Sequence, residues 1–297
     1  MAEEQTLSLP RPSERRLALV LSGGGNLGVV QAPFLEHLIA IGVTPDLIVG
    51  TSVGALNGAF LAFHPHNIDG LGDIWRALRD QRLWHRNILR IGRNLLGRGM
   101  SLYSNEFLHD LIAPHVTVDE IAASEIPLFI TATSLSRGRK HVFTRGPVVD
   151  AILASSAVPG VFPPVQIGGE WFVDAGVATG LDLETAILQG ATEILAVDLG
   201  SEPSPYRPRG LVDLLARSME IATQERTRSE VDQFGREASM VIWRPGLQAA
   251  SGSNFRDVGQ LYEAARELAP ALIERSRNAD GSWRRGIYEG AVSIRRA

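Results

Sequence analysis

The chain contains two short apolar runs that each pass through glycines directly into a helical pattern. LALVL (17–21) is followed by SGGGNLG, and DLIVG (46–50) is followed by TSVGALNGAFLAF. A buried strand that leads at once into a helix, and does so repeatedly, is typical of parallel strands joined by crossover helices. We therefore predict an α/β fold with a mostly parallel central sheet flanked by helices.

The remaining pattern extends this fold over residues 15–297 as a single domain. Apolar runs predict strands at 127–135, 140–144, 169–176, 193–200 and 239–245, and helical patterns are found at 147–160, 210–235 and 257–276. The polar residues 1–14 predict a disordered lead-in. Residues of about 70–125 are helical in pattern and more polar, and they predict a cap-like insertion.

The composition excludes several classes of protein. None of the 297 residues is cysteine, which excludes disulfides, thiolate metal sites and cysteine nucleophiles and fits a cytoplasmic protein. The net charge of −4 argues against a nucleic-acid partner. No apolar run reaches the roughly 18 residues of a transmembrane helix, so any membrane attachment is expected to be peripheral. No feature indicates a particular oligomeric state.

Gly50-Thr51-Ser52-Val53-Gly54 places a serine between two glycines where the second strand meets its helix. Gly-x-Ser-x-Gly at such a junction is typical of a nucleophile elbow, whose turn is too tight for side chains at the two glycine positions. The serine projects above the sheet edge at a helix N-terminus, where the dipole and free N–H groups favour negative charge. Ser52 is the candidate nucleophile; the alternative is an ordinary glycine turn.

The glycine-rich segment 22–28 has two functional interpretations. Its glycines satisfy the dinucleotide pattern Gly-x-Gly-x-x-Gly, but Asp46 begins the second strand, whereas the acidic residue of such a site should end it. The other interpretation is an oxyanion hole, in which bare backbone N–H groups approach an acyl oxygen. Close packing of helix on strand would also require glycine. The pattern glycines are Gly23, Gly25 and Gly28.

An attacking serine needs a proton acceptor. No histidine follows His141, so the usual α/β-hydrolase order of serine, acid and histidine cannot be met. Asp174 is the stronger candidate, because it closes a predicted strand and is followed by small residues. Burial would raise its proton affinity enough for a dyad with Ser52. A plain loop aspartate is the other interpretation. The histidines, interpreted as surface or cap residues, are His37, His64, His66, His85, His109, His115 and His141.

These segments together resemble the patatin-like phospholipase family. Members carry a glycine-rich oxyanion loop, then Gly-x-Ser-x-Gly, then a distant Asp-Gly-Gly or Asp-Gly-Ala; here these are Gly23–Gly28, Gly50–Gly54 and Asp174–Gly176. Residues 154–164 (ASSAVPGVFPP) are similar to the segment before the family's aspartate. The resemblance covers about 17–200. It implies a three-layer α/β/α sandwich and a Ser52–Asp174 dyad that needs no histidine, metal or cofactor.

The same resemblance implies a serine esterase that cleaves lipid esters through an acyl-enzyme, as a lysophospholipase, phospholipase A or carboxylesterase. The expected oxyanion donors are the N–H groups of Gly24, Gly25, Asn26 and Val53. Acyl transfer by the same dyad is one alternative. A catalytically quiet regulator or scaffold that retains the fold is another.

Two residues depart from the family pattern. Leu27 stands where the oxyanion loop often has arginine or lysine, so a charge near the site is missing and a phosphate preference is in doubt. Ala175 follows the aspartate where glycine is usual. Its methyl group would strain the loop if that position required a positive φ.

The stretch RLWHRNILRIGRNLLGRG (82–99) has a basic and an apolar stripe at helical spacing. A basic amphipathic helix can lie at an anionic lipid surface, so peripheral membrane contact is one interpretation. The interpretation we favour is a cap helix whose apolar stripe packs on the core. The stripes are Arg82, Arg86, Arg90 and Arg93, and Trp84, Ile88, Ile91 and Leu95.

Overall fold

The computed structural model describes residues 15–78, 101, 104–116, 118–200, 207, 210–248 and 257–293. The lead-in 1–14 and the basic stretch 82–99 lie outside the described residues, so both expectations remain predictions. The described residues of the stretch predicted as a cap-like insertion, about 70–125, include α3 (Asp69–Leu78) and α5 (Glu106–Ile112). Whether this stretch is a separate cap remains a prediction.

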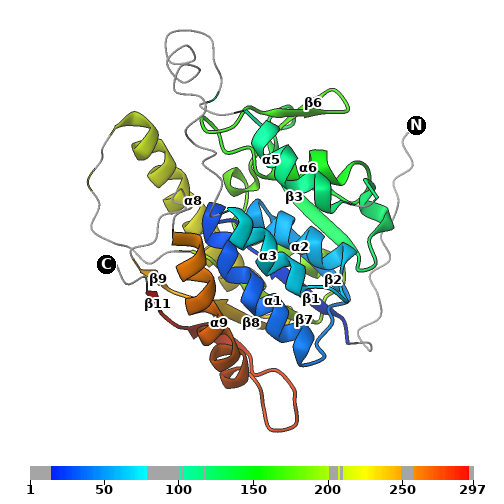
Figure 1. The fold of residues 1–297 in the computed structure, drawn as a ribbon, viewed down its shortest axis with the longest axis vertical. Helices are drawn as coiled ribbons and strands as arrows, with labels where there is room; N and C mark the ends of the chain where they lie inside the picture. The colour runs from blue at the N-terminus through cyan, green and yellow to red at the C-terminus, as the bar shows by residue number, and fades with distance from the viewer. Residues whose placement is uncertain are drawn as a thin grey trace.

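A nine-stranded mixed sheet lies at the centre of the described chain (Figure 1). Its strands are β1 (Leu17–Leu21), β2 (Leu47–Thr51), β3 (Leu128–Ser134), β4 (Arg139–Phe143), β5 (Val165–Ile167), β6 (Glu170–Val173), β7 (Glu193–Val197), β8 (Ser239–Arg244) and β10 (Gly286–Glu289). The order is β10-β8-β7-β1-β2-β3-β6-β5, with β4 also paired to β3. Neighbours from β10 to β3 are parallel, whereas β4, β5 and β6 pair antiparallel. A small separate sheet joins β9 (Leu247–Gln248) and β11 (Val292–Ser293).

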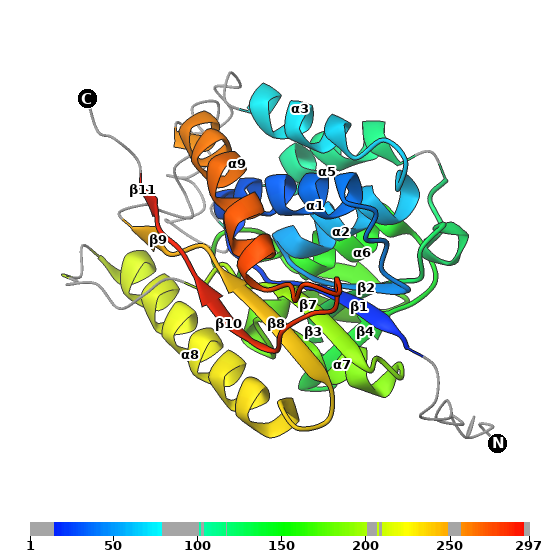
Figure 2. The ribbon, with the colours of Figure 1, turned by 90° about the horizontal axis from the view of Figure 1, so that it is seen from below.

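Helices cover both faces of the sheet (Figure 2). On one face lie α1 (Gln31–Ala40), α2 (Val53–Phe63), α6 (Val148–Ser155) and α9 (Val258–Arg275), and on the other α7 (Leu183–Leu188) and α8 (Leu211–Phe234). Alternate residues of β1 enter the two cores: Leu19 and Leu21 face the first layer, Ala18 and Val20 the second. This arrangement confirms the three-layer α/β/α sandwich.

The first crossover helix is preceded by a short 3₁₀ helix. A 3₁₀ helix, η1 (Gly25–Val30), opens directly from the glycine loop and continues into α1. Pro33 lies in the first turn of α1, where backbone N–H groups have no intrahelical acceptor. Proline, which lacks this N–H, therefore costs the helix no hydrogen bond there. The glycine loop therefore passes through a 3₁₀ helix before the α-helix starts.

The carboxyl ends of β1, β2 and β7 meet at one edge of the sheet, because the three strands are parallel neighbours. The chain leaves β1 for β2 on one side and returns as β7 on the other, which makes this edge a topological switch point. Open α/β sheets bind ligands at such a point. None of the described helices combines the length and apolar character needed to span a bilayer.

Candidate active site

The sheet register brings Ser52 and Asp174 to the same level on opposite sides of β3. Thr51, the last residue of β2, is paired with Thr131, and Val173, the last residue of β6, is paired with Thr133. Because β2 runs parallel and β6 antiparallel to β3, the next residue of each strand comes level with Ala132. Two residues far apart in the sequence thus end beside one central strand.

Ser52 occupies a strained backbone conformation at the junction of β2 and α2. Its φ of 54° and ψ of −121° make it the one non-glycine residue with a positive φ among those described. Such a conformation costs roughly 1–3 kcal/mol and persists only when the surroundings hold it. A Cβ at Gly50 would lie 2.5 Å from Ala55 Cα, and one at Gly54 would lie 2.3 Å from Leu21 O. The predicted tight turn is therefore present.

The Gly54→Ala variant is expected to lose roughly 3 kcal/mol of unfolding free energy, at the upper end of overpacking costs. The added methyl meets rigid backbone of β1, so a rotamer change cannot relieve the clash. Helix propensity alone predicts the opposite sign, by about 1 kcal/mol. Denaturant unfolding measures the difference. Gly210→Ala is the control, because a Cβ there meets no described atom within 4 Å; equal midpoints for the two variants would contradict the prediction.

The Asp174 carboxyl group is buried, with 5% of the residue exposed. Its Oδ1 accepts a hydrogen bond from the Gly176 N–H at 2.7 Å. Burial raises the pKa of Asp174 to about 6, while the Ser52 hydroxyl and the Gly176 N–H act in the opposite direction. Among the described residues Oδ2 has no well-formed hydrogen bond. It is thus the carboxylate oxygen with a free lone pair. In enzymes generally, catalytic hydrogen bonds are often long without substrate and shorten when it binds.

The glycine loop is seated directly on the serine elbow. A Cβ at Gly23 would lie 3.2 Å from Ser52 Cβ, and one at Gly28 would lie 2.2 Å from Val53 Cγ2. Gly25 has a φ of 61°, which favours glycine for a second reason. The N-termini of η1 and α2 therefore meet at Ser52, and the first N–H groups of a helix have no intrahelical acceptor. The predicted donors Gly24, Gly25, Asn26 and Val53 all lie at these two N-termini.

A buried polar network, which the sequence did not reveal, fixes both ends of the glycine loop. Asn57 Nδ2 donates to Gly28 O at 2.9 Å and to Gln31 Oε1 at 2.8 Å. Gln31 Nε2 donates to Ser22 O at 2.9 Å, and Trp75 Nε1 donates to Asn57 Oδ1 at 3.0 Å. Buried polar networks rigidify their surroundings when every member is paired. The one signal in the sequence was a polar residue, Asn57, among the small and apolar residues of α2.

Helix α8 holds the loop that follows Asp174. Thr223 Oγ1 donates to Gly176 O at 2.7 Å. Glu230 accepts from Thr179 Oγ1 at 2.6 Å and from the Leu183 N–H at 3.2 Å. Burial raises the pKa of Glu230 to about 7, against the effect of its bond from Thr179. No sequence pattern linked this distant helix to the site.

The competing sequence interpretations find other structural roles. Asp46 Oδ2 accepts from the Leu17 N–H at 2.7 Å, at the opposite end of β1 from the glycine loop, so it cannot serve a ligand there. Within the described residues no histidine hydrogen-bonds to Ser52 or Asp174, and His85 lies outside them. His64, for example, contacts His115 O. The side chain of His141 packs against phenylalanines.

Both departures from the family pattern are accommodated without strain. Leu27 is 7% exposed and belongs to the larger core, so an apolar residue is well placed there. Ala175 is fully buried and does not have a positive φ. The concern that its methyl group strains the aspartate loop is therefore not realised.

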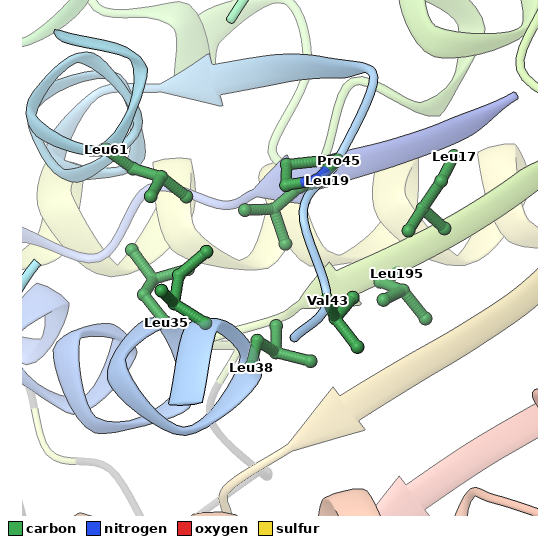
Figure 3. Close-up of a pocket in the computed structure, with 9 residues that line it drawn as sticks. Leu17, Leu19, Leu35, Leu38, Val43, Pro45, Leu61 and Leu195 are labelled. Carbon is green, nitrogen blue, oxygen red and sulfur yellow. The ribbon is translucent and has the colours of Figure 1, made fainter. Parts of the chain in front are cut away.

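Figure 3 shows an apolar hollow lined by residues such as Leu17, Leu38 and Val43. It lies near the amino ends of β1 and β2, whereas Ser52 follows the carboxyl end of β2. Neither Ser52 nor Asp174 lines it. The hollow is part of the packing beneath α1 and takes no role in the site.

A family model described as patatin-like phospholipase matches residues 19–187, more than half of the chain. The chain belongs to the patatin-like phospholipase family. The matched stretch holds the glycine loop, the elbow and Asp174. The β7, β8 and β10 strands of this patatin-like protein, with α8 and α9, follow the match.

Named relatives of this patatin-like protein come from fungi, bacteria and mammals. Lysophospholipase nte1 of Aspergillus terreus is 28% identical over 290 residues, covering 89% of this chain and 18% of the relative. An uncharacterised NTE family protein of Mycobacterium bovis is 31% identical over 199 residues, covering 66% and 52%. Patatin-like phospholipase domain-containing protein 7 of Mus musculus is 27% identical over 194 residues, covering 62% and 14%. The chain thus spans about half or less of these relatives.

A similarity to a solved structure is more distant. VipD from Legionella pneumophila aligns with a TM-score of 0.41 at 13% identity, covering 87% of this chain and 67% of that one.

Proposed function

We propose that this chain hydrolyses carboxylic esters of lipids, with Ser52 as nucleophile and Asp174 as general base. The observation that carries the proposal is the register across β3, which sets a strained serine and a buried carboxyl group level with each other. Family membership supports a lipid hydrolase. The dyad is the part that the site geometry favours.

The reaction follows from the groups present. Ser52 Oγ attacks the ester carbonyl carbon while Asp174 Oδ2 takes its proton, and the N–H groups of Gly24, Gly25, Asn26 and Val53 stabilise the developing oxyanion. The proton then passes to the leaving alcohol, which departs and leaves an acyl-serine. Water then attacks the acyl carbon and gives its proton to Asp174. As the bond from this carbon to Ser52 Oγ breaks, Asp174 returns the proton to Oγ, which releases the free fatty acid and restores both residues. Each oxyanion donor lowers the barrier by roughly 2.7–4 kcal/mol in comparable enzymes.

The proposed substrates are lysophospholipids and simple carboxylic esters. The names of two relatives, lysophospholipase and patatin-like phospholipase domain-containing protein, support lipid esters. The buried Leu27 offers no cation to a phosphate, so the acyl ester rather than the head group is the proposed point of recognition. A cytoplasmic location with peripheral membrane contact belongs to the same proposal.

The test is labelling with a fluorophosphonate, whose phosphorus is attacked by an activated serine with loss of fluoride. We expect mass spectrometry to place the adduct on Ser52. The labelling rate should rise with pH and be half-maximal near pH 6, because only ionised Asp174 can accept the proton.

The control is Glu230→Gln. Burial raises the pKa of Glu230 to about 7, close to that of Asp174, but Glu230 hydrogen-bonds to the 179–183 loop. This variant should therefore keep the half-maximal labelling rate near pH 6. Labelling at another residue, no labelling of folded protein, or a flat profile from pH 5 to 8 would count against the dyad. Absence of labelling would favour the scaffold alternative.

A further inference from the structure

Two residues at the C-terminal end of α6, its last residue Ser155 and Ala157 just beyond it, hold the backbones of both proposed dyad residues. The Ser52 N–H donates to Ser155 Oγ at 2.7 Å, across a sequence separation of 103 residues. The Asp174 N–H donates to Ala157 O at 2.9 Å. A single stretch of chain thus contacts the nucleophile on one side and the base on the other.

The hydroxyl group of Ser155 both donates and accepts a hydrogen bond. It is completely buried, and it donates its proton to Thr131 O of β3 at 2.6 Å. A hydroxyl group has one proton, so the Ser52 N–H meets a lone pair. The result is a continuous chain of hydrogen bonds from β3 through Ser155 to Ser52. Such chains strengthen their members by mutual polarisation.

The strand β3 anchors the base in a similar way. Thr133 Oγ1 donates to the carbonyl oxygen of Asp174 at 2.9 Å. Thr131 and Thr133 therefore contact the two halves of the proposed dyad, one through Ser155 and one directly. Since Ser52 holds a φ of 54°, the contacts that resist its relaxation determine where Oγ lies.

We propose that Ser155 is a positioning residue, which fixes the Ser52 backbone so that its hydroxyl group faces Asp174. The inference rests on the proposed function and deepens it. Without the Ser155 hydroxyl group, the strained elbow loses the acceptor for the Ser52 N–H, and the backbone can move away from the base. Substrate contacts made elsewhere are unaffected, so the chemical step should suffer and binding should not.

The experiment compares Ser155→Ala with wild type and with Ser52→Ala, using steady-state hydrolysis of a lysophospholipid and of a short p-nitrophenyl ester. We expect kcat of Ser155→Ala to fall about 100-fold with KM within about twofold, because a displacement near 1 Å has an effect of this size. Ser155→Cys puts a slightly larger thiol that hydrogen-bonds more weakly at the same position, so its kcat should lie between those of wild type and Ser155→Ala. That variant also serves if Ser155→Ala does not fold.

The matched control is Ser156→Ala, the same chemical change at the neighbouring residue. Ser156 is partly exposed and its hydroxyl group makes no hydrogen bond to the described residues, so its kcat should match wild type. The inference is overturned if folded Ser155→Ala or Ser155→Cys keeps wild-type kcat, or if only KM changes. It is also overturned if kcat of Ser156→Ala falls as much as kcat of Ser155→Ala. Wild-type protein without Ser52-dependent turnover would overturn the proposed function, and the inference with it.

Discussion

Replacing Ser52 by alanine is expected to lower kcat for ester hydrolysis by about 10⁶-fold, to the level left by the loss of a serine nucleophile. The change removes the oxygen that we propose forms the acyl-enzyme and leaves the rest of the site. Alanine carries a Cβ as serine does, so the strain at φ 54° is the same in both proteins and folding should be retained. KM should change little, because Ser52 Oγ bonds to substrate only during the reaction.

Progress curves with a lysophospholipid, read by release of fatty acid, provide the measurement. Thermal unfolding of the same samples shows whether Ser52→Ala is folded. Ser156→Ala again serves as the control for a lost hydroxyl group. Activity within tenfold of wild type in folded Ser52→Ala would place the nucleophile elsewhere.

Replacing Asp174 by asparagine is expected to lower kcat by about 10³-fold, within the range of general-base contributions. The amide has the same shape, and its oxygen can still accept from the Gly176 N–H. It cannot take the proton from Ser52. The remaining turnover should lose the rise in rate near pH 6, because the group that titrates there is gone. A pH–rate profile with an unchanged rise would assign the base to another residue.

The same substitution is expected to stabilise the protein above pH 6. Burial raises the pKa of Asp174 from 3.8 to about 6, so folding favours the protonated form. The stability contributed by the neutral carboxyl group is full below pH 4 and is lost as the pH rises through 6. Asparagine avoids this loss. Asp174→Asn should therefore exceed wild type by roughly 3 kcal/mol at pH 8 and match it near pH 4.

Urea unfolding of both proteins at pH 4, 6 and 8 tests this stability difference. Glu230→Gln is an informative comparison, because burial raises the pKa of Glu230 as well, and its window should lie about one pH unit higher. A wild-type protein that is more stable than Asp174→Asn at pH 8 would show that the carboxylate is stabilised in the fold. That result would contradict a base with a raised pKa.

Local patterns predicted the elements that carry the proposed site. The strands β1 and β2 were evident because each is a fully buried apolar run that ends at glycines. The elbow at Ser52 followed from the same junction. Strand β10 was missed because it is a half-exposed strand at the end of the sheet, with arginine and glycine rather than an apolar run at its start. Because an edge strand is partly exposed, its sequence carries only a weak apolar pattern.

Partners in the folded chain could not be predicted from the same patterns. Nothing near Ser155 marks its hydroxyl group as the acceptor for the Ser52 N–H, because the pairing depends on how α6 packs on β3. Thr223 is similar: it occupies a polar position on a long helix, and only the fold brings it to Gly176. Strand order and register, rather than residue type, supply these contacts.

The pairing of β1 with β7 bears on how the protein matures as it is synthesised. Leu199 packs against Gly24, and its N–H donates to Ser22 Oγ at 2.8 Å, so the glycine loop needs a segment that leaves the ribosome much later. Chain closure over such a separation is slow compared with local folding. A nascent chain that has exposed the elbow but not Leu199 should therefore lack a finished glycine loop, and the proposed lipid cleavage would have to wait until Leu199 has emerged.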